Sequence, residues 1–184
     1  MKGRDLDLKK VIINIVLILT FLVIYLLQIN FFSWFKIAGI MPNLFVIYIL
    51  FIGLFISKTA GATYGIALGI LLDLFIGKHV GISAIMLGVV GLIGGFFDKN
   101  FSKESRITIM IMVVISTFIY EAGAYILSHF IQNATFEFFS FLKILSIECV
   151  YNVIITIIVY PWVQALGYKV EEEYKGNKIL TRYF

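Results

Sequence analysis

The sequence predicts an all-α integral membrane protein with six transmembrane helices and both termini in the cytoplasm, and three observations predict it. Hydrophobic residues make up 61% of the 184 residues and charged residues only 14%, whereas a soluble domain is about 45–50% apolar and about 25% charged. Long apolar stretches with almost no charge recur along the chain, and most basic residues lie between alternate stretches. The 28 Phe and Tyr residues argue against disorder, and the single cysteine, Cys149, argues against a disulfide scaffold.

Six stretches approach the length of about 20 apolar residues that a helix needs to cross the hydrocarbon core. In chain order they predict spans at about 11–27, 40–56, 60–76, 80–97, 107–130 and 142–166. Acidic residues occur inside three of these spans, at Asp73, Glu121 and Glu148. The apolar runs are continuous and do not alternate with period two, which favours helices over a β-barrel. We therefore expect one polytopic membrane domain over 1–184, with a cytoplasmic tail at 169–184.

The orientation follows from the basic residues, because cytoplasmic loops are enriched in Lys and Arg. With the N-terminus inside, twelve of the fifteen basic residues lie on the inner side, and Lys36, Lys78 and Lys143 lie on the outer side. The same asymmetry explains the net charge of +4. It predicts contact with anionic lipid headgroups and gives no argument for nucleic acid as a partner.

Small residues recur every fourth position in the third predicted span. The series is Gly61, Gly65, Gly69, Asp73 and Gly77, and Gly81 follows in the next segment. Small residues let helix backbones approach closely in lipid. Because the series drifts by about 40° around the helix at each step, we expect this helix to be central and to pack against at least two others. The fourth span is expected to be a close neighbour through Gly88, Gly91, Gly94 and Gly95.

Two functions remain open for the glycine series and three for Asp73. The glycines either pack the protein's own helices or form a groove for the helix of a partner. A carboxylate inside a span is costly. Asp73 either fixes the turn at 77–81 through an ion pair with Lys78 or a helix-end hydrogen bond, or contacts a partner or ligand, or relays protons.

Polar residues also recur every fourth position in the last two spans. They are Thr117, Glu121, Tyr125 and His129 in the fifth, and Glu148, Asn152, Thr156 and Tyr160 in the sixth. Buried polar groups need partners in lipid, so we expect both series to face the bundle interior. They act either as hydrogen bonds between helices or as a polar pocket that opens outward, with candidate lining residues Glu121, Tyr125, Glu148 and Asn152. Pro161 is expected to bend the last helix.

Three sequence blocks together resemble the MreD family, the rod shape-determining membrane proteins of bacteria. They are Pro42-Asn43-Leu44, the glycine series from Gly61 through Asp73 to Gly77, and Val80-Gly81. The family motif corresponds here to Pro42, Gly61, Gly65, Gly69, Asp73, Gly77 and Gly81. The resemblance implies a place in the bacterial cytoplasmic membrane and a role in lateral peptidoglycan synthesis. It also implies MreC, MreB, RodA and a class B penicillin-binding protein as partners, no enzymatic activity and no cofactor.

The resemblance further implies a fold similar to the substrate-binding subunits of energy-coupling-factor transporters, so two functions are weighed. The first is a non-enzymatic scaffold that docks MreC and other elongation proteins. The alternative is the substrate-binding subunit of a vitamin transporter of that type. Such subunits typically carry Ala-x-x-x-Ala in the first span, and residues 11–35 contain neither Ala nor Gly. An enzyme is disfavoured because His79 and His129 lie in different segments and no catalytic or metal-binding motif occurs. The sequence leaves homo-oligomerisation open.

Overall fold

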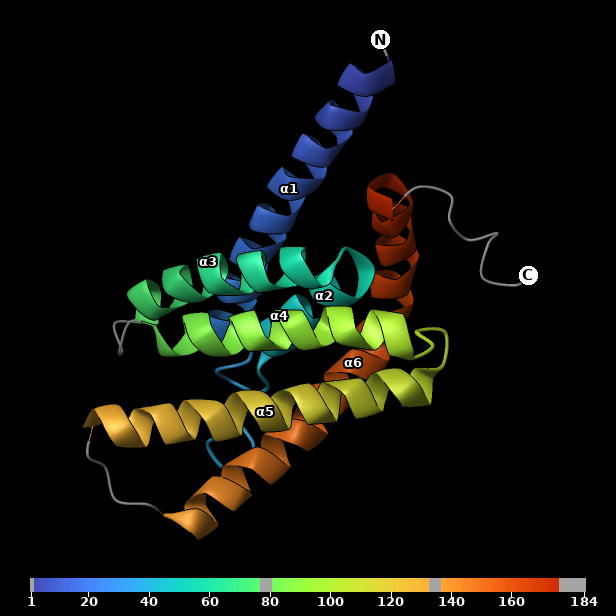
Figure 1. The fold of residues 1–184 in the computed structure, drawn as a ribbon. Coiled ribbons are helices and arrows are strands. Elements are labelled where there is room, and N and C mark those ends of the chain that lie inside the picture. Colours follow the sequence, from blue (N-terminus) through green and yellow to red (C-terminus); the bar gives the residue numbers. More distant parts are fainter. Residues whose placement is uncertain (1, 77–80, 133–136, 176–184) are drawn as a thin grey trace.

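The computed structural model describes residues 2–76, 81–132 and 137–175, and nearly all of them are helical (Figure 1). The helices are α1 (Lys2–Leu26), which continues into a π-helical turn η1 (Leu27–Phe31), α2 (Leu44–Phe55), α3 (Lys58–Ile76), α4 (Ile82–Asn100), α5 (Arg106–Gln132) and α6 (Phe138–Lys175). Five of these segments are long and apolar enough to cross a membrane, and α2 is shorter. The prediction of a helical, multi-pass membrane protein is therefore confirmed.

Helix α2 lies at the centre of the bundle. It has 12 residues, which is about 18 Å of helix against a hydrocarbon core of about 30 Å. Every residue in it except Tyr48 is buried, and it contacts α1, α3, α4, α5 and α6. Helix α2 begins inside the predicted span of 40–56, because Pro42 precedes the helix and the Asn43 side chain caps it by accepting from the Val46 N–H at 3.4 Å.

Helix α3 packs against α4 and α2, but the expectation that it would be central is wrong. Only one side of it is buried, and Ile66, Ile70 and Leu74 on the other side are exposed. The glycine series meets α4 along its whole described length. Rows of residues four apart are inclined to the helix axis. A neighbouring helix that crosses at an angle lies along such a row, so one helix can contact the whole series.

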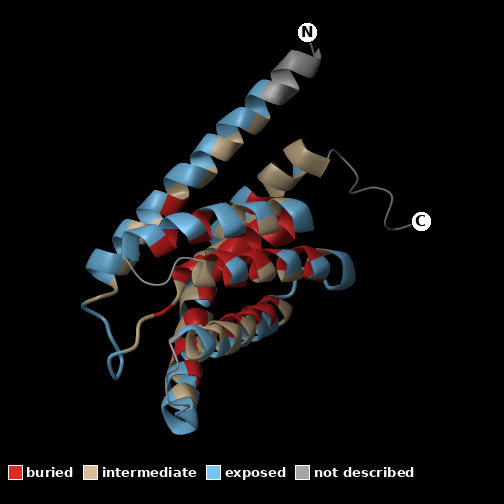
Figure 2. Ribbon diagram, turned by 60° about the vertical axis from the view of Figure 1, so that its left-hand side comes forward, coloured by how far each residue is buried: buried red, intermediate tan, exposed pale blue. Residues whose placement is uncertain are grey.

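The N-terminal part of helix α1 extends away from the rest of the bundle, whereas its C-terminal part packs against it (Figure 2). Of its side chains from Leu8 to Leu26, only that of Phe21 is buried. Tyrosine hydroxyls from three other helices hold it: Tyr48 of α2 donates to the Leu17 carbonyl at 2.6 Å, and Tyr64 of α3 and Tyr174 of α6 both donate to Asn14 Oδ1. Most of the circumference of α1 is therefore left to lipid or to another protein.

Helix α6 is 38 residues long and contains Pro161, and Figure 1 shows that it changes direction along its length. This agrees with the expected bend, because proline cannot donate a hydrogen bond to the carbonyl four residues earlier. The helix runs beyond the predicted span of 142–166 at both ends. Residues 169–175, which belong to the predicted cytoplasmic tail, are helical and continue α6.

Candidate functional site: a polar cavity at one end of the bundle

A cavity of about 940 Å³ opens at the end of the bundle where α1 and α3 end and where α2 and α4 begin. Its volume is within the range of sites that hold small molecules or cofactors. Its polar lining comes from five helices and one loop, and includes Gln28, Asn43, Asp73, Tyr120, Glu121 and Glu148. Pro42 and Lys36 also line it. The cavity therefore brings together residues that the sequence singled out in four separate segments.

Two carboxyl groups lie close together in the wall of this cavity. Glu121 of α5 and Glu148 of α6 lie close enough to interact, and both lie near the Asn43 side chain. Glu148 is only 6% exposed, and its Oε1 atom has no hydrogen-bond partner among the described residues. An ionised carboxylate can only accept hydrogen bonds, so this oxygen of Glu148 lacks a donor in the described part of the chain even though the Asn43 side chain lies nearby.

Asn152, which follows Glu148 in the polar series of α6, joins three helices instead of lining the cavity. Asn152 donates from Nδ2 to Thr117 Oγ1 at 2.9 Å, and its Oδ1 accepts from the backbone N–H of Asn43 at 2.7 Å. The Thr156 hydroxyl donates to the Asn152 carbonyl at 2.7 Å. These buried contacts fix the start of α2 against α5 and α6.

The hydroxyls of Tyr125 and Tyr160 form hydrogen bonds with the backbone of residues that are not among the described cavity lining. Tyr125 accepts from the Glu137 N–H at 2.7 Å, near the end of α5. Tyr160 donates to the Lys103 carbonyl at the opposite end of the bundle. Of the four candidate pocket residues, Glu121 and Glu148 line the cavity, whereas Tyr125 and Asn152 are not among the lining residues that the structure describes.

Asp73 caps helix α4. Its carboxylate accepts from the backbone N–H groups of Gly81 at 2.7 Å, Ser83 at 3.3 Å and Ala84 at 3.4 Å, and the residue is 3% exposed. The first N–H groups of a helix lack partners within the helix, and the helix dipole favours a negative charge there. The geometry matches the helix-end hydrogen bond proposed for Asp73. Lys78 and Gly77 lie outside the described residues.

We expect Asp73→Ala to lower the free energy of unfolding by about 2 kcal/mol, the upper range for loss of a helix cap, because buried N–H groups would lose their acceptor. Asp73→Asn keeps one acceptor oxygen, so its loss should be about half as large. Unfolding of the purified protein in mixed detergent micelles by increasing sodium dodecyl sulfate measures both variants. Equal stability of Asp73→Ala and the unchanged protein would contradict the capping role.

The glycines of α3 lie directly against the backbone of α4. A Cβ atom at Gly61 would be 2.6 Å from the Gly91 carbonyl oxygen, and one at Gly69 would be 2.5 Å from the Ala84 Cα. A Cβ at Gly65 would collide with the Leu87 carbonyl. Helix α4 thus fills the groove that these glycines form, so a partner helix has no access to it. Gly81 has a different reason to be glycine, since its φ of +112° lies in the left-handed region.

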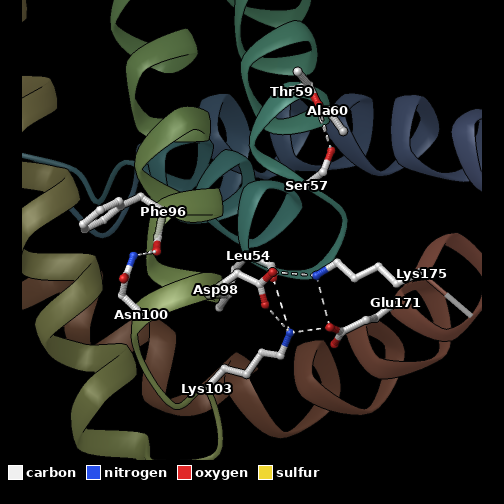
Figure 3. Close-up of polar contacts among 10 residues, drawn as sticks. All are labelled: Leu54, Ser57, Thr59, Ala60, Phe96, Asp98, Asn100, Lys103, Glu171 and Lys175. Atoms are coloured by element: carbon white, nitrogen blue, oxygen red, sulfur yellow. Dashed lines mark hydrogen bonds and ion pairs between the residues drawn. The ribbon is translucent and has the colours of Figure 1, made fainter. Parts of the chain in front are cut away.

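A cluster of four charged side chains at the other end of the bundle was not anticipated from the sequence (Figure 3). The Lys103 ammonium lies 2.7 Å from both Asp98 and Glu171, and the Lys175 ammonium lies 2.7 Å from Asp98 and 3.1 Å from Glu171. These side chains are 12–26% exposed. Lys103 also lies 5.2 Å from the ring centre of Phe55, at the end of α2. The cluster fastens the end of α6 to α4 and to the loop before α5.

The fold and the site define a multi-pass helical membrane protein. Its buried polar groups mostly join one helix to another, and the described residues contain no group of three or more His, Cys, Asp or Glu side chains that could hold a metal. The model of one protein family, rod shape-determining protein MreD, matches residues 9–170. The chain belongs to the MreD family and hence to the proteins involved in rod-shape determination, which confirms the resemblance carried by residues 42–81. No curated protein and no solved structure matches the chain.

Proposed function

We propose that the protein is a non-enzymatic scaffold of the cell-elongation machinery in the bacterial cytoplasmic membrane. It helps to set rod shape and lateral peptidoglycan synthesis by docking MreC, and through it or beside it MreB, RodA and a class B penicillin-binding protein. Membership of the MreD family supports the role in shape. The observation that carries the docking proposal is the accessibility of α1, whose described side chains from Leu8 to Leu26 include a single buried residue.

The accessible surface of α1 offers a single-span partner a long contact. Its candidate membrane segment, Leu8–Phe31, has 24 residues, enough to span the hydrocarbon core. The exposed side chains recur at helical spacing along this length, for example Ile15, Leu19 and Val23 at 52–55% exposure. Helices associate in lipid by close packing, and α1 presents branched side chains on a helix that the tyrosine hydrogen bonds already hold in place. We therefore assign MreC docking to α1 and not to the glycine series.

We expect the double variant Leu19→Trp/Val23→Trp to reduce co-purification with MreC by about tenfold, equivalent to about 1.4 kcal/mol of binding free energy. The two indole rings would hold a partner helix away from α1. The measurement is the amount of MreC retained by affinity-tagged protein after co-expression.

Ile111→Trp is the matched control, because Ile111 is 53% exposed on α5, whereas the hydrogen bonds that hold α1 come from α2, α3 and α6. It should leave MreC retention unchanged and should show that a surface tryptophan does not disturb membrane insertion. Normal retention by the α1 variant would show that the docking surface lies elsewhere on the protein.

The transporter alternative is favoured by one observation, the cavity of about 940 Å³. Against it stands the lack of Ala and Gly in residues 11–35, where the docking motif of those subunits would lie. The same co-purification separates the two functions: a scaffold retains elongation proteins, whereas a transporter subunit retains a pair of ATPases and their membrane coupling protein.

A further inference from the structure

The cavity has the size and the lining of a ligand site, which the docking function does not require. Apolar side chains supply part of its wall, among them Ile29, Phe45, Leu72 and Ile144. Sites for small ligands combine such an apolar wall with a few polar groups that fix orientation. Here most of the polar groups already have protein partners: Asp73 caps α4, and Asn43 caps α2.

One oxygen of Glu148 is the exception. Glu148 is more than nine-tenths buried, lines the cavity and has an oxygen without a hydrogen-bond partner among the described residues. Glu121 faces it from α5. Two facing carboxyl groups in a partly apolar wall repel each other when both are ionised, and they are stabilised by a cationic donor placed between them.

An ammonium group fits this arrangement because it carries three N–H donors and no acceptor. The exposed Lys36 in the loop before α2 lines the same cavity, and its charge suits an anionic group on the same ligand, such as a phosphate. We propose that the cavity binds a molecule with a primary ammonium group and an apolar part, and that Glu121 and Glu148 accept hydrogen bonds from the ammonium. The ammonium can come from an ethanolamine lipid headgroup or from a soluble amine.

Native mass spectrometry of the purified full chain, released from detergent free of phospholipid, tests the proposal. The probes are phosphatidylethanolamine, phosphatidylglycerol with the same acyl chains, and hexylamine. If the source is a lipid, phosphatidylethanolamine should be retained at one molecule per chain and about tenfold more strongly than phosphatidylglycerol. If the source is a soluble amine, hexylamine should bind and neither lipid should be preferred. Equal retention of both lipids together with no binding of hexylamine would overturn the proposal.

Two glutamine variants separate a specific site from a general charge effect. Glu148→Gln should weaken binding of the preferred probe by about tenfold, whereas Glu137→Gln should leave it unchanged. Glu137 is exposed near the same end of the bundle and hydrogen-bonds Ser140 at 2.8 Å, so it matches Glu148 in charge but not in burial. An equal effect of both variants would refute a site at Glu148.

A measurement on the unchanged protein decides the case if Glu148→Gln does not fold. Dicyclohexylcarbodiimide, an apolar reagent, attaches covalently to buried carboxyl groups in membranes, and peptide mass spectrometry locates the labelled residue. The preferred probe should lower labelling of Glu148 at least about fivefold. If no probe lowers it, the two carboxyl groups satisfy each other by sharing a proton, and the cavity is not an ammonium site.

Discussion

Replacing Gly91 by alanine is expected to destabilise the protein by about 3 kcal/mol or more, the upper part of the range for overpacked cores. A Cβ atom there would collide with the carbonyl group of Gly61 and would lie 2.7 Å from the backbone nitrogen of Ala62. All these atoms belong to the backbone, which cannot rotate out of the way as a side chain can. Helix α4 is also in contact with α2 through Gly94 on another side, so it cannot simply move. Sodium dodecyl sulfate titration measures the loss.

Gly88→Ala provides the matched control, since Gly88 lies one turn earlier on the same helix. Its Cβ would meet the end of the Ile66 side chain, 2.8 Å from Cγ1, and Ile66 is 48% exposed and free to change rotamer. We expect a loss below about 1 kcal/mol. If the two alanine variants had equal stability, close approach of the α3 and α4 backbones would not be what requires glycine at 91.

The sequence predicted which helices approach closely but not which helix lies at the centre. The four-residue spacing of small residues is specific for backbone contact, and it correctly pairs α3 with α4. By contrast, α1 from Val11 onward and the whole of α2 carry no charge, and yet α1 is largely exposed and α2 is buried. Lipid is as apolar as a protein core, so hydrophobicity alone does not separate the two environments in a membrane. The short length of α2 is the feature that distinguishes it from α1. Asn43 caps its start and the helix ends at Phe55, so α2 is too short to span the hydrocarbon core.

The site was predictable in part for a similar reason. Spacing by four residues placed Glu121 and Glu148 on polar faces of their helices, and both line the cavity. Residues four apart are offset from each other by about 40° around the helix. Tyr125 therefore turns toward the Glu137 backbone, and Asn152 turns toward Thr117. The charged cluster had no local signal apart from the pair Glu171 and Lys175, four residues apart. Its remaining contacts to α6 join residues 68 and 77 positions apart, which only the folded bundle brings together.

Replacing Lys103 by methionine should destabilise the protein by about 2–3 kcal/mol. Removing one partner of a buried ion pair costs about 3–5 kcal/mol, and the partial exposure of this cluster reduces the loss through solvent screening. The variant leaves Asp98 and Glu171 to share Lys175, so one negative charge remains uncompensated. It also removes the cation that faces Phe55 at the end of α2. Detergent unfolding measures the loss, and faster proteolysis of the C-terminal turns of α6 locates it.

Two further variants show whether charge balance in the cluster is the cause. Lys9→Met removes an exposed ion pair with Glu173 on the same end of α6, where Lys9 is 57% exposed, and should cost less than about 1 kcal/mol. Adding Asp98→Asn to Lys103→Met removes the excess negative charge, so the double variant should be more stable than Lys103→Met alone by about 1 kcal/mol. If the double variant is instead less stable by the sum of two independent losses, packing of the Lys103 stem, and not its charge, holds α6 to the bundle.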